Sequence, residues 1–245
     1  MNIIITMAGL GKRFSDAGFK ELKYKIEVHG HSLFFWAITS LQNFIHSKNT
    51  FIFVAKKKNG VLDFIKNECS SIGISQYEII ELSSSTDGQA TSALHASNKI
   101  DDFNEPVIIY NIDTYVEPQY LRTEDIHGWG WLPCFPGKGN HWSFARIGPY
   151  GIVDLVREKK RISPHATIGL YYFRSFNLYK EMYDEYYSDP TNIEPKERYI
   201  APLYNQLIAN GLTVYITQIP FKAVHVLGTP RELKEFEVNY YYQKE

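Results

Sequence analysis

Short apolar runs and longer amphipathic stretches alternate along the first half of this sequence. The short runs are rich in β-branched residues, which is typical of buried strands. Such alternation predicts a parallel sheet with helices on both of its faces. The predicted strands are residues 1–5, 51–55, 77–82 and 106–112, and the predicted helices are residues 33–44, 60–72 and 88–98.

The pattern changes after residue 128, where short aromatic strands follow one another without helices between them. These strands predict a small antiparallel extension of the sheet. We expect aromatic strands at 129–135, 142–147, 152–157 and 167–173, then helices at 176–187 and 199–210, a strand at 213–219 and a closing helix at 231–242. The chain is therefore predicted to form one α/β domain.

A glycine-rich, basic segment follows the first predicted strand directly. Residues 8–13 read Ala-Gly-Leu-Gly-Lys-Arg. Glycine permits a tight turn and allows backbone N–H groups to approach a phosphate closely. Arg13 and Lys23 place positive charge at the sheet edge where open α/β folds bind their ligands. The segment therefore predicts a polyphosphate site, and the alternative is a simple turn between a strand and a loop.

Two better-known glycine loops are excluded by spacing. The dinucleotide fingerprint needs a third glycine where Phe14 stands, and the P-loop needs serine or threonine where Arg13 follows Gly11 and Lys12. The remaining pattern is Gly-x-Gly-x-Arg.

Composition limits the classes of partner. The 26 basic and 27 acidic residues give a formal net charge of -1, so there is no basic field to attract nucleic acid or a membrane surface. Eighteen tyrosines suit stacking on sugars or bases, subunit contacts or a packed core, and this leaves a homo-oligomer open. No apolar stretch approaches the length of a membrane span, and no basic region precedes the first apolar run, so we expect a cytoplasmic protein.

The cysteines and histidines indicate neither a disulfide nor a metal cluster. Cys69 and Cys134 stand alone and match no disulfide or zinc spacing. His29 and His31 flank Gly30 without a third ligand nearby, which favours a turn.

Five segments, taken in chain order, resemble the sugar-nucleotide pyrophosphorylases of the glucose-1-phosphate thymidylyltransferase type. That family joins a nucleoside triphosphate to a sugar 1-phosphate. The segments that carry the resemblance are Ala8-Gly9-Leu10-Gly11-Lys12-Arg13 with Leu22-Lys23; Thr86-Asp87-Gly88-Gln89-Ala90; Asn111-Ile112-Asp113; Val156-Arg157-Glu158-Lys159 with Gly169-Leu170-Tyr171; and Leu227-Gly228-Thr229-Pro230.

The resemblance implies a role for each matched residue and Mg²⁺ as the cofactor. It makes Arg13 and Lys23 catalytic and Asp113 the metal ligand. The residues implied to bind the nucleotide are Met7, Ala8, Gly9, Gly11, Gly88 and Gln89, and those implied to bind the phosphorylated acceptor are Glu158, Lys159 and Gly169.

The resemblance also implies the fold and the biological setting. The fold is a Rossmann-like, three-layer α/β/α nucleotidyltransferase domain with a mostly parallel mixed sheet. Residues 1–115 form its nucleotide-binding part, residues 116–230 its acceptor-binding part and residues 231–245 the closing helix. The product would be an NDP-sugar for cell-surface polysaccharide such as capsule or lipopolysaccharide. A glycosyltransferase and a non-catalytic nucleotide-sugar-binding relative stay open as alternatives, as do the base and the acceptor.

Two positions depart from the family pattern. Leu22 stands where the family has proline, which we expect to loosen the loop that carries Lys23. Val226 stands where the family has a second metal-binding aspartate, and it is preceded by His225. Mg²⁺ commonly takes only one or two protein carboxylates, with phosphates and water completing its shell. A site built on Asp113 alone, or with help from His225, is therefore chemically workable.

Each candidate also has a structural interpretation. Arg13 and Lys23 could be solvated surface charges, and Asp113 could cap a turn at the end of a strand. Asp87 could be the N-cap of a helix that merely begins at Gly88. A run of charges around Glu158 and Lys159 is also typical of an exposed strand end.

Overall fold

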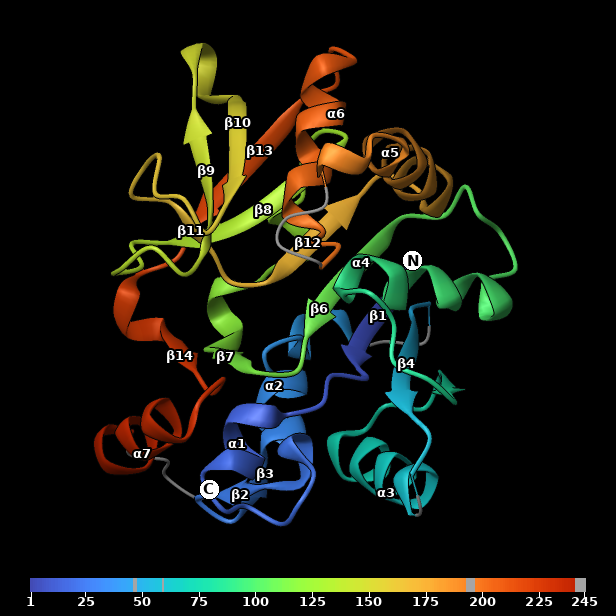
Figure 1. The fold of residues 1–245 in the computed structure, drawn as a ribbon, viewed down its shortest axis with the longest axis vertical. Coiled ribbons are helices and arrows are strands. Elements are labelled where there is room, and N and C mark those ends of the chain that lie inside the picture. The colour runs from blue at the N-terminus through green and yellow to red at the C-terminus, as the bar shows by residue number, and fades with distance from the viewer. Residues whose placement is uncertain (46–47, 59, 193–196, 241–245) are drawn as a thin grey trace.

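The computed structural model describes residues 1–45, 48–58, 60–192 and 197–240. Ten strands of this described part form one mixed sheet in the order β10-β9-β11-β8-β12-β6-β1-β4-β5, and β13 pairs with β8 off this path (Figure 1). The strands are β1 Asn2–Met7, β4 Thr50–Lys56, β5 Tyr77–Leu82, β6 Val107–Asn111, β8 Gly130–Phe135, β9 Ser143–Ile147, β10 Val153–Glu158, β11 Ala166–Thr167, β12 Leu170–Phe173 and β13 Val214–Gln218.

The first predicted strand lies at the centre of the parallel part. β1 pairs in parallel with β4 on one side and with β6 on the other, and β4 pairs in parallel with β5. Its side chains alternate between the two faces: Ile3 and Ile5 enter one core and Ile4 enters the other. Because both faces are covered, the strand has no polar face, which explains its continuous apolar sequence.

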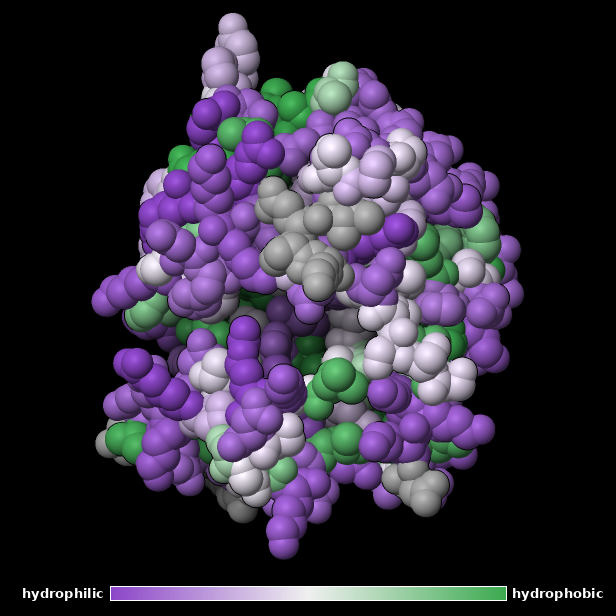
Figure 2. Space-filling model, in the orientation of Figure 1, coloured by the Kyte–Doolittle hydropathy of each residue, from purple (hydrophilic) through white to green (hydrophobic). Residues whose placement is uncertain are grey.

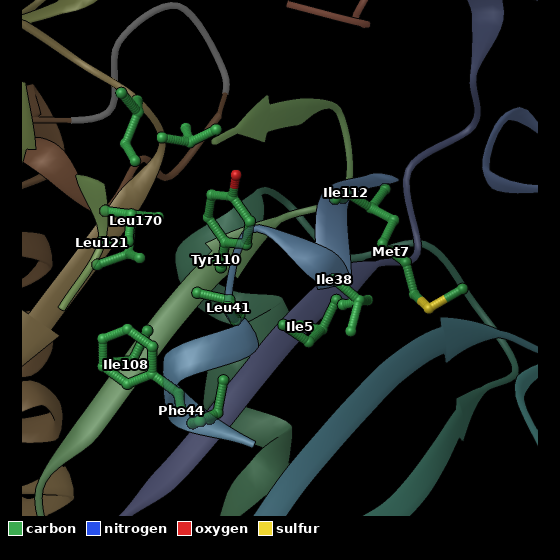
Figure 3. Close-up of a cluster of buried hydrophobic side chains, with 14 of the residues drawn as sticks. Ile5, Met7, Ile38, Leu41, Phe44, Ile108, Tyr110, Ile112, Leu121 and Leu170 are labelled. Carbon is green, nitrogen blue, oxygen red and sulfur yellow. The ribbon is translucent and has the colours of Figure 1, made fainter. Parts of the chain in front are cut away.

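Helices cover both faces of the parallel strands. α2 Leu33–Thr39 and α3 Val61–Ile72 pack on one face, while α4 Gln89–Leu94, α5 Phe176–Ser188 and α6 Tyr204–Ala209 pack on the other. Figure 3 shows part of the first core, where side chains of α2 meet those of β1 and β6. The three-layer arrangement predicted from the alternation is confirmed.

The antiparallel extension continues the same sheet. β12 pairs antiparallel with β6 through Leu170 opposite Tyr110, and it also pairs antiparallel with β8. β13 returns from much later in the chain to lie parallel to β8. The extension consists of the strands β8 to β13. The predicted mixed α/β class is confirmed.

Several predicted elements are divided by specific contacts or turns. The predicted helix at 33–44 ends as α2 at Thr39 and is followed by a 3-10 turn, Gln42–Phe44. Between them, the buried Ser40 hydroxyl accepts a hydrogen bond from the backbone N–H of Val116 at 2.9 Å. The predicted strand at 167–173 breaks at Gly169, whose φ of +82° turns the chain between β11 and β12.

The predicted helices near the end of the chain also differ in their bounds. The segment predicted as a helix at 199–210 begins with a 3-10 turn, Ala201–Leu203, before α6, and Gly211 ends it with a φ of +72°. The closing helix is α7, Pro230–Asn239. Residues 241 and 242, which were predicted to extend it, lie outside the described residues.

Two short antiparallel strand pairs were not predicted. β2 Glu27–Val28 pairs with β3 His31–Ser32 across the predicted turn, in which His29 and Gly30 both have positive φ. β7 Thr114–Val116 pairs antiparallel with β14 Val224–Val226. Strands of two or three residues are too short to show an alternating pattern.

An aromatic cluster joins α7 to the rest of the domain. His225 on β14 contacts the rings of Tyr115, Phe236 and Tyr240 at centroid distances of 5.5, 5.2 and 4.7 Å. Burial lowers the pKa of His225 to about 4. Glu117, with Oε1 3.9 Å from Nε2, would favour the protonated ring, but at that distance its attraction is weaker than the cost of desolvation.

We predict that His225 makes the fold less stable in mild acid. Its pKa is lower in the folded state than the ordinary 6.5, so the unfolded chain takes up the proton first as pH falls. The stability that depends on a neutral His225 ring is fully present above pH 6.5 and is lost progressively as pH falls toward 4. The loss amounts to about 2 kcal/mol of unfolding free energy at pH 5. Urea unfolding at pH 7.5 and pH 5 should show a smaller drop for His225→Gln than for wild type. The exposed His127→Gln should behave as wild type, and equal drops in all three proteins would contradict the prediction.

Candidate functional site

The candidates Arg13, Lys23 and Asp113 follow the carboxyl ends of the parallel strands β1 and β6. The ends of β1 and β6 point to the middle of the view in Figure 1, and Figure 2 shows the surface hollowed there, between the two halves of the molecule. A separate polar cavity of about 580 Å³ lies at the amino ends of β1, β4 and β5, lined in part by Asn2, Thr50 and Tyr77. That cavity contains none of the candidate residues.

The glycine loop leaves β1 and turns at once into a short helix. Gly11 has a φ of +60° and begins α1, Lys12–Asp16, in which Phe14 is buried and Arg13 is exposed. A Cβ on Gly11 would lie 3.2 Å from the Cβ of Lys23, so glycine lets these two segments approach closely. Gly9 faces open space, with no atom within 4 Å of a Cβ placed there.

Lys23 and Asp113 form an ion pair at the centre of the site. The Nζ of Lys23 lies 2.6 Å from Oδ2 of Asp113, and the two side chains are 15% and 33% exposed. The prediction that Leu22 loosens this loop is not supported by its conformation. Leu22 has a φ of -62°, the value that proline would impose, and its side chain packs against the core beside α2.

The turn that carries Asp113 is held at two points. The buried Tyr110 hydroxyl donates to the carbonyl of Thr114 at 2.6 Å, and the N–H of Leu227 donates to the carbonyl of Asp113 at 2.7 Å. The carboxylate is therefore fixed where β6 gives way to β7. The interpretation of Asp113 as a turn cap does not account for its ion pair with Lys23.

The predicted base-binding turn packs on a segment that sequence reasoning did not consider. A Cβ on Gly88 would lie 2.4 Å from the carbonyl oxygen of Arg198, and Gly88 has a φ of +151°. Gln89 donates from Nε2 to the hydroxyl of Thr6 on β1 at 3.0 Å. Asp87 does not cap the helix, because Gly88 is the N-cap residue, and it instead lies 3.0 Å from Nε of Arg198.

The predicted acceptor residues gather around the ends of β10 and β12. Gly169 lies directly against Asn111, since a Cβ would be 2.0 Å from the Asn111 amide nitrogen. Glu158 ends β10, and its carboxylate accepts a hydrogen bond from Ser143. Lys159 has a φ of +52°, and its N–H donates to the backbone of Trp142 at 2.9 Å. These residues are therefore held by specific contacts and do not form a simple solvated charge run.

Tyr199 contacts the predicted acceptor residue Lys159 and is influenced by the charge of Arg13. Lys159 donates to its hydroxyl and lies 4.4 Å from its ring centroid, and the hydroxyl donates to Glu197. Burial, with Glu197 and Glu158 adding to it, raises the pKa of Tyr199, whereas Arg13 acts to lower it. Residues from α1 and β10, far apart in sequence, therefore influence one side chain.

Sequence reasoning missed Tyr199 and Arg198, which face the site from a loop without a motif. Arg198 contacts Asp87 and donates to the hydroxyl of Tyr183 at 2.6 Å. The Glu-Arg-Tyr run at 197–199 is unremarkable by composition, so only its place in the fold identifies it.

The residues present fit a hard divalent cation. Asp113 offers a carboxylate at the carboxyl edge of the sheet. A second carboxylate, that of Glu232, has a buried oxygen with no hydrogen-bond partner among the described residues. His225 points its ring into the aromatic cluster, and Val226 pairs with Thr114. Among the described residues no group of three or more histidine, cysteine, aspartate or glutamate side chains could hold a metal by itself.

Comparison with known proteins shows clear structural relatives. No protein-family model and no curated protein matches the chain. A nucleoside-diphosphate-sugar pyrophosphorylase from Vibrio cholerae is 33% identical, with a TM-score of 0.88 over 97% of this chain and 99% of that one. An inositol-1-phosphate CTP transferase from T. maritima is 12% identical, with a TM-score of 0.72 over 98% of each chain. A putative glucose-1-phosphate thymidylyltransferase from Bacillus anthracis is 14% identical, with a TM-score of 0.73 over 100% and 98%.

These similarities define the class of protein. The two distant structures share the fold, and the 33% identity across nearly the whole of both chains makes the protein a nucleotidyltransferase of the pyrophosphorylase type. The chain belongs to the nucleoside-diphosphate-sugar pyrophosphorylase family. The resemblance drawn from the five motifs is thus confirmed. In the part of the chain that the structure describes, none of the helices is both long and apolar enough to cross a membrane.

We predict that Gly88 is required for the fold of the base-binding turn as well as for binding. Gly88→Ala would place a Cβ 2.4 Å from a backbone oxygen and 2.5 Å from a backbone nitrogen of Arg198, neither of which can move freely. Urea unfolding should show a loss of about 2 kcal/mol or more. Gly9→Ala, where a Cβ meets nothing within 4 Å, is the matched control and should keep wild-type stability. Equal stability of the two variants would refute this account of Gly88.

Proposed function

We propose that this protein joins a nucleoside triphosphate to a sugar 1-phosphate or a similar phosphorylated small molecule. A phosphate oxygen of the acceptor attacks the α-phosphorus and forms a new P–O bond. The bond from the α-phosphorus to the bridging oxygen breaks, and pyrophosphate leaves with that oxygen and its electron pair. The ion pair of Lys23 with Asp113 beside the glycine loop is the observation that carries this proposal.

The reaction requires alignment and charge neutralisation more than proton transfer. The attacking phosphate is already anionic, so no general base has to activate it, and positioned cations supply most of the catalysis. Arg13 and the backbone N–H groups of Gly9 and Gly11 would hold the β- and γ-phosphates. Lys23 would neutralise the charge on the α-phosphate and the acceptor phosphate as they approach each other.

The remaining candidates divide between the two substrates. Gly88 and Gln89, at the start of α4, would bind the base, and Met7 and Ala8 would line the nucleotide. Lys159 would bind the acceptor phosphate once it exchanges its contact with Tyr199 for one with the ligand. Glu158 would accept a hydrogen bond from the acceptor. Gly169, which has no side chain, would let the backbone before β12 lie close against Asn111 on this side of the site.

We assign Mg²⁺ to Asp113, because carboxylates are the protein ligands that Mg²⁺ prefers. When bound, the ion would offset the negative charge of the triphosphate. Nucleoside triphosphates and sugar phosphates are metabolites of the cytoplasm, where we place the enzyme.

A pyrophosphate-release assay tests the proposal. The protein is incubated with Mg²⁺, with ATP, CTP, GTP, TTP or UTP, and with a panel of sugar 1-phosphates, inositol 1-phosphate and phosphocholine. Pyrophosphate should form only with a matched pair. A glycosyltransferase would instead consume a nucleotide sugar without releasing pyrophosphate, and a binding protein would show nucleotide affinity without turnover. Either result would refute the proposed reaction.

We predict that Lys23→Ala lowers kcat by about two orders of magnitude, the typical cost of losing one donor that stabilises transition-state charge. KM for the triphosphate should change much less, because Arg13 and the loop backbone still bind its outer phosphates. Lys20→Ala removes the same charge from an exposed position of the same loop and should keep wild-type turnover. Near-normal kcat in Lys23→Ala would remove this residue from the proposed catalytic role.

A further inference from the structure

Two carboxylates from distant parts of the chain converge on the backbone of Gly228. A Cβ built on Gly228 would lie 3.4 Å from Oδ2 of Asp113 and 3.4 Å from Oε2 of Glu232. Since both oxygens approach the same point, they lie on one side of this backbone. Glycine at position 228 leaves that space free of side-chain atoms.

The carboxylate of Glu232 has an unsatisfied oxygen. Its Oε2 is buried and has no hydrogen-bond partner in the part of the chain that the structure describes. Lys23, the cation beside Asp113, makes its ion pair with that aspartate. A buried carboxylate oxygen without a donor or cation is costly, so its retention indicates a partner that arrives with the ligands.

The local sequence explains how Glu232 comes to face the site. Thr229 caps α7 by accepting a hydrogen bond from the N–H of Glu232 at 3.2 Å. In a Thr-x-x-Glu capping box, the glutamate would reach back to the N–H of the capping threonine. Among the described residues Oε2 of Glu232 makes no such bond, and it lies beside Gly228 and Asp113 instead.

We infer that Glu232 is a ligand of the divalent cation assigned to Asp113. It supplies from the first turn of α7 the second carboxylate that Val226 cannot supply. The inference rests on the proposed function for the presence of a cation in this site. Two carboxylates are the usual upper number of protein ligands for Mg²⁺, and the pair binds one cation in the protein without nucleotide.

Manganese titration tests this inference without relying on turnover. The full chain is titrated with MnCl₂ in the absence of nucleotide, and free Mn²⁺ is measured by electron paramagnetic resonance. Glu232→Gln should weaken Mn²⁺ binding about tenfold or more. Losing a group that only orients a metal ligand already costs about tenfold, and losing a ligand should cost at least as much. Glu235→Gln removes the same charge from the same helix, at an exposed residue paired with Arg231, and should bind Mn²⁺ as wild type does.

A thermal unfolding series separates metal binding from helix capping. Mn²⁺ should raise the Tm of wild type and of Glu235→Gln, and the rise should be lost in Glu232→Gln. If Glu232 only caps α7, its variant would have a lower Tm by the same amount with and without Mn²⁺. Mn²⁺ binding that does not depend on Glu232, or no Mn²⁺ binding by the wild type, would overturn the inference.

The outcomes also distinguish this inference from the proposed function. Pyrophosphate release by the wild type, combined with unchanged Mn²⁺ affinity in Glu232→Gln, would reject the role of Glu232 alone. Mn²⁺ binding that depends on Glu232, without pyrophosphate release for any substrate pair, would reject the proposed reaction and retain the metal site. Adding Val226→Asp to Glu232→Gln should restore part of the lost affinity, because it places a carboxylate on β14 opposite Thr114, next to the turn that carries Asp113.

Discussion

The ion pair between Lys23 and Asp113 is the interaction on which the site depends. It joins the loop after β1 to the turn after β6, two neighbouring parallel strands, across 90 residues of sequence. Each partner is fixed separately: Leu22 and Gly11 place the lysine, and the hydrogen bonds of Tyr110 and Leu227 place the aspartate. The lysine ammonium is therefore aimed before any substrate enters, so little reorganisation is needed when phosphate charge arrives.

The parts of the fold that could be predicted from sequence are those with a strong local pattern. α3 matches its predicted bounds to within one residue because its buried residues Val61, Ile65 and Cys69 recur at helical spacing. The helix after residue 33 was predicted too long, because the apolar pattern continues past Thr39 through the buried Leu41 and Phe44 of the following 3-10 turn. The antiparallel pairing of β7 with β14 was missed, because each strand has three residues and they lie about a hundred positions apart in the sequence.

The candidate site shows the same division. Lys23, Asp113 and the glycine loop, which the structure brings together, could be predicted as candidates because they lie in short, ordered motifs. Tyr199 and Glu232 were not found, because their importance arises from contacts that no local pattern reports. The argument for Gly88 also changed: the missing Cβ makes room for the backbone of Arg198, a segment more than a hundred residues away.

The antiparallel pairing of β6 with β12 has a consequence for how the chain folds during synthesis. β1, β4, β5 and β6 have all been made once residue 111 emerges, yet one edge of β6 stays unpaired until Leu170–Phe173 follows. That edge is apolar and open, the kind of surface on which nascent chains aggregate. The first half is therefore an incomplete folding unit. A nascent chain stalled between residues 111 and 170 would expose an aggregation-prone strand edge that a chaperone would have to protect.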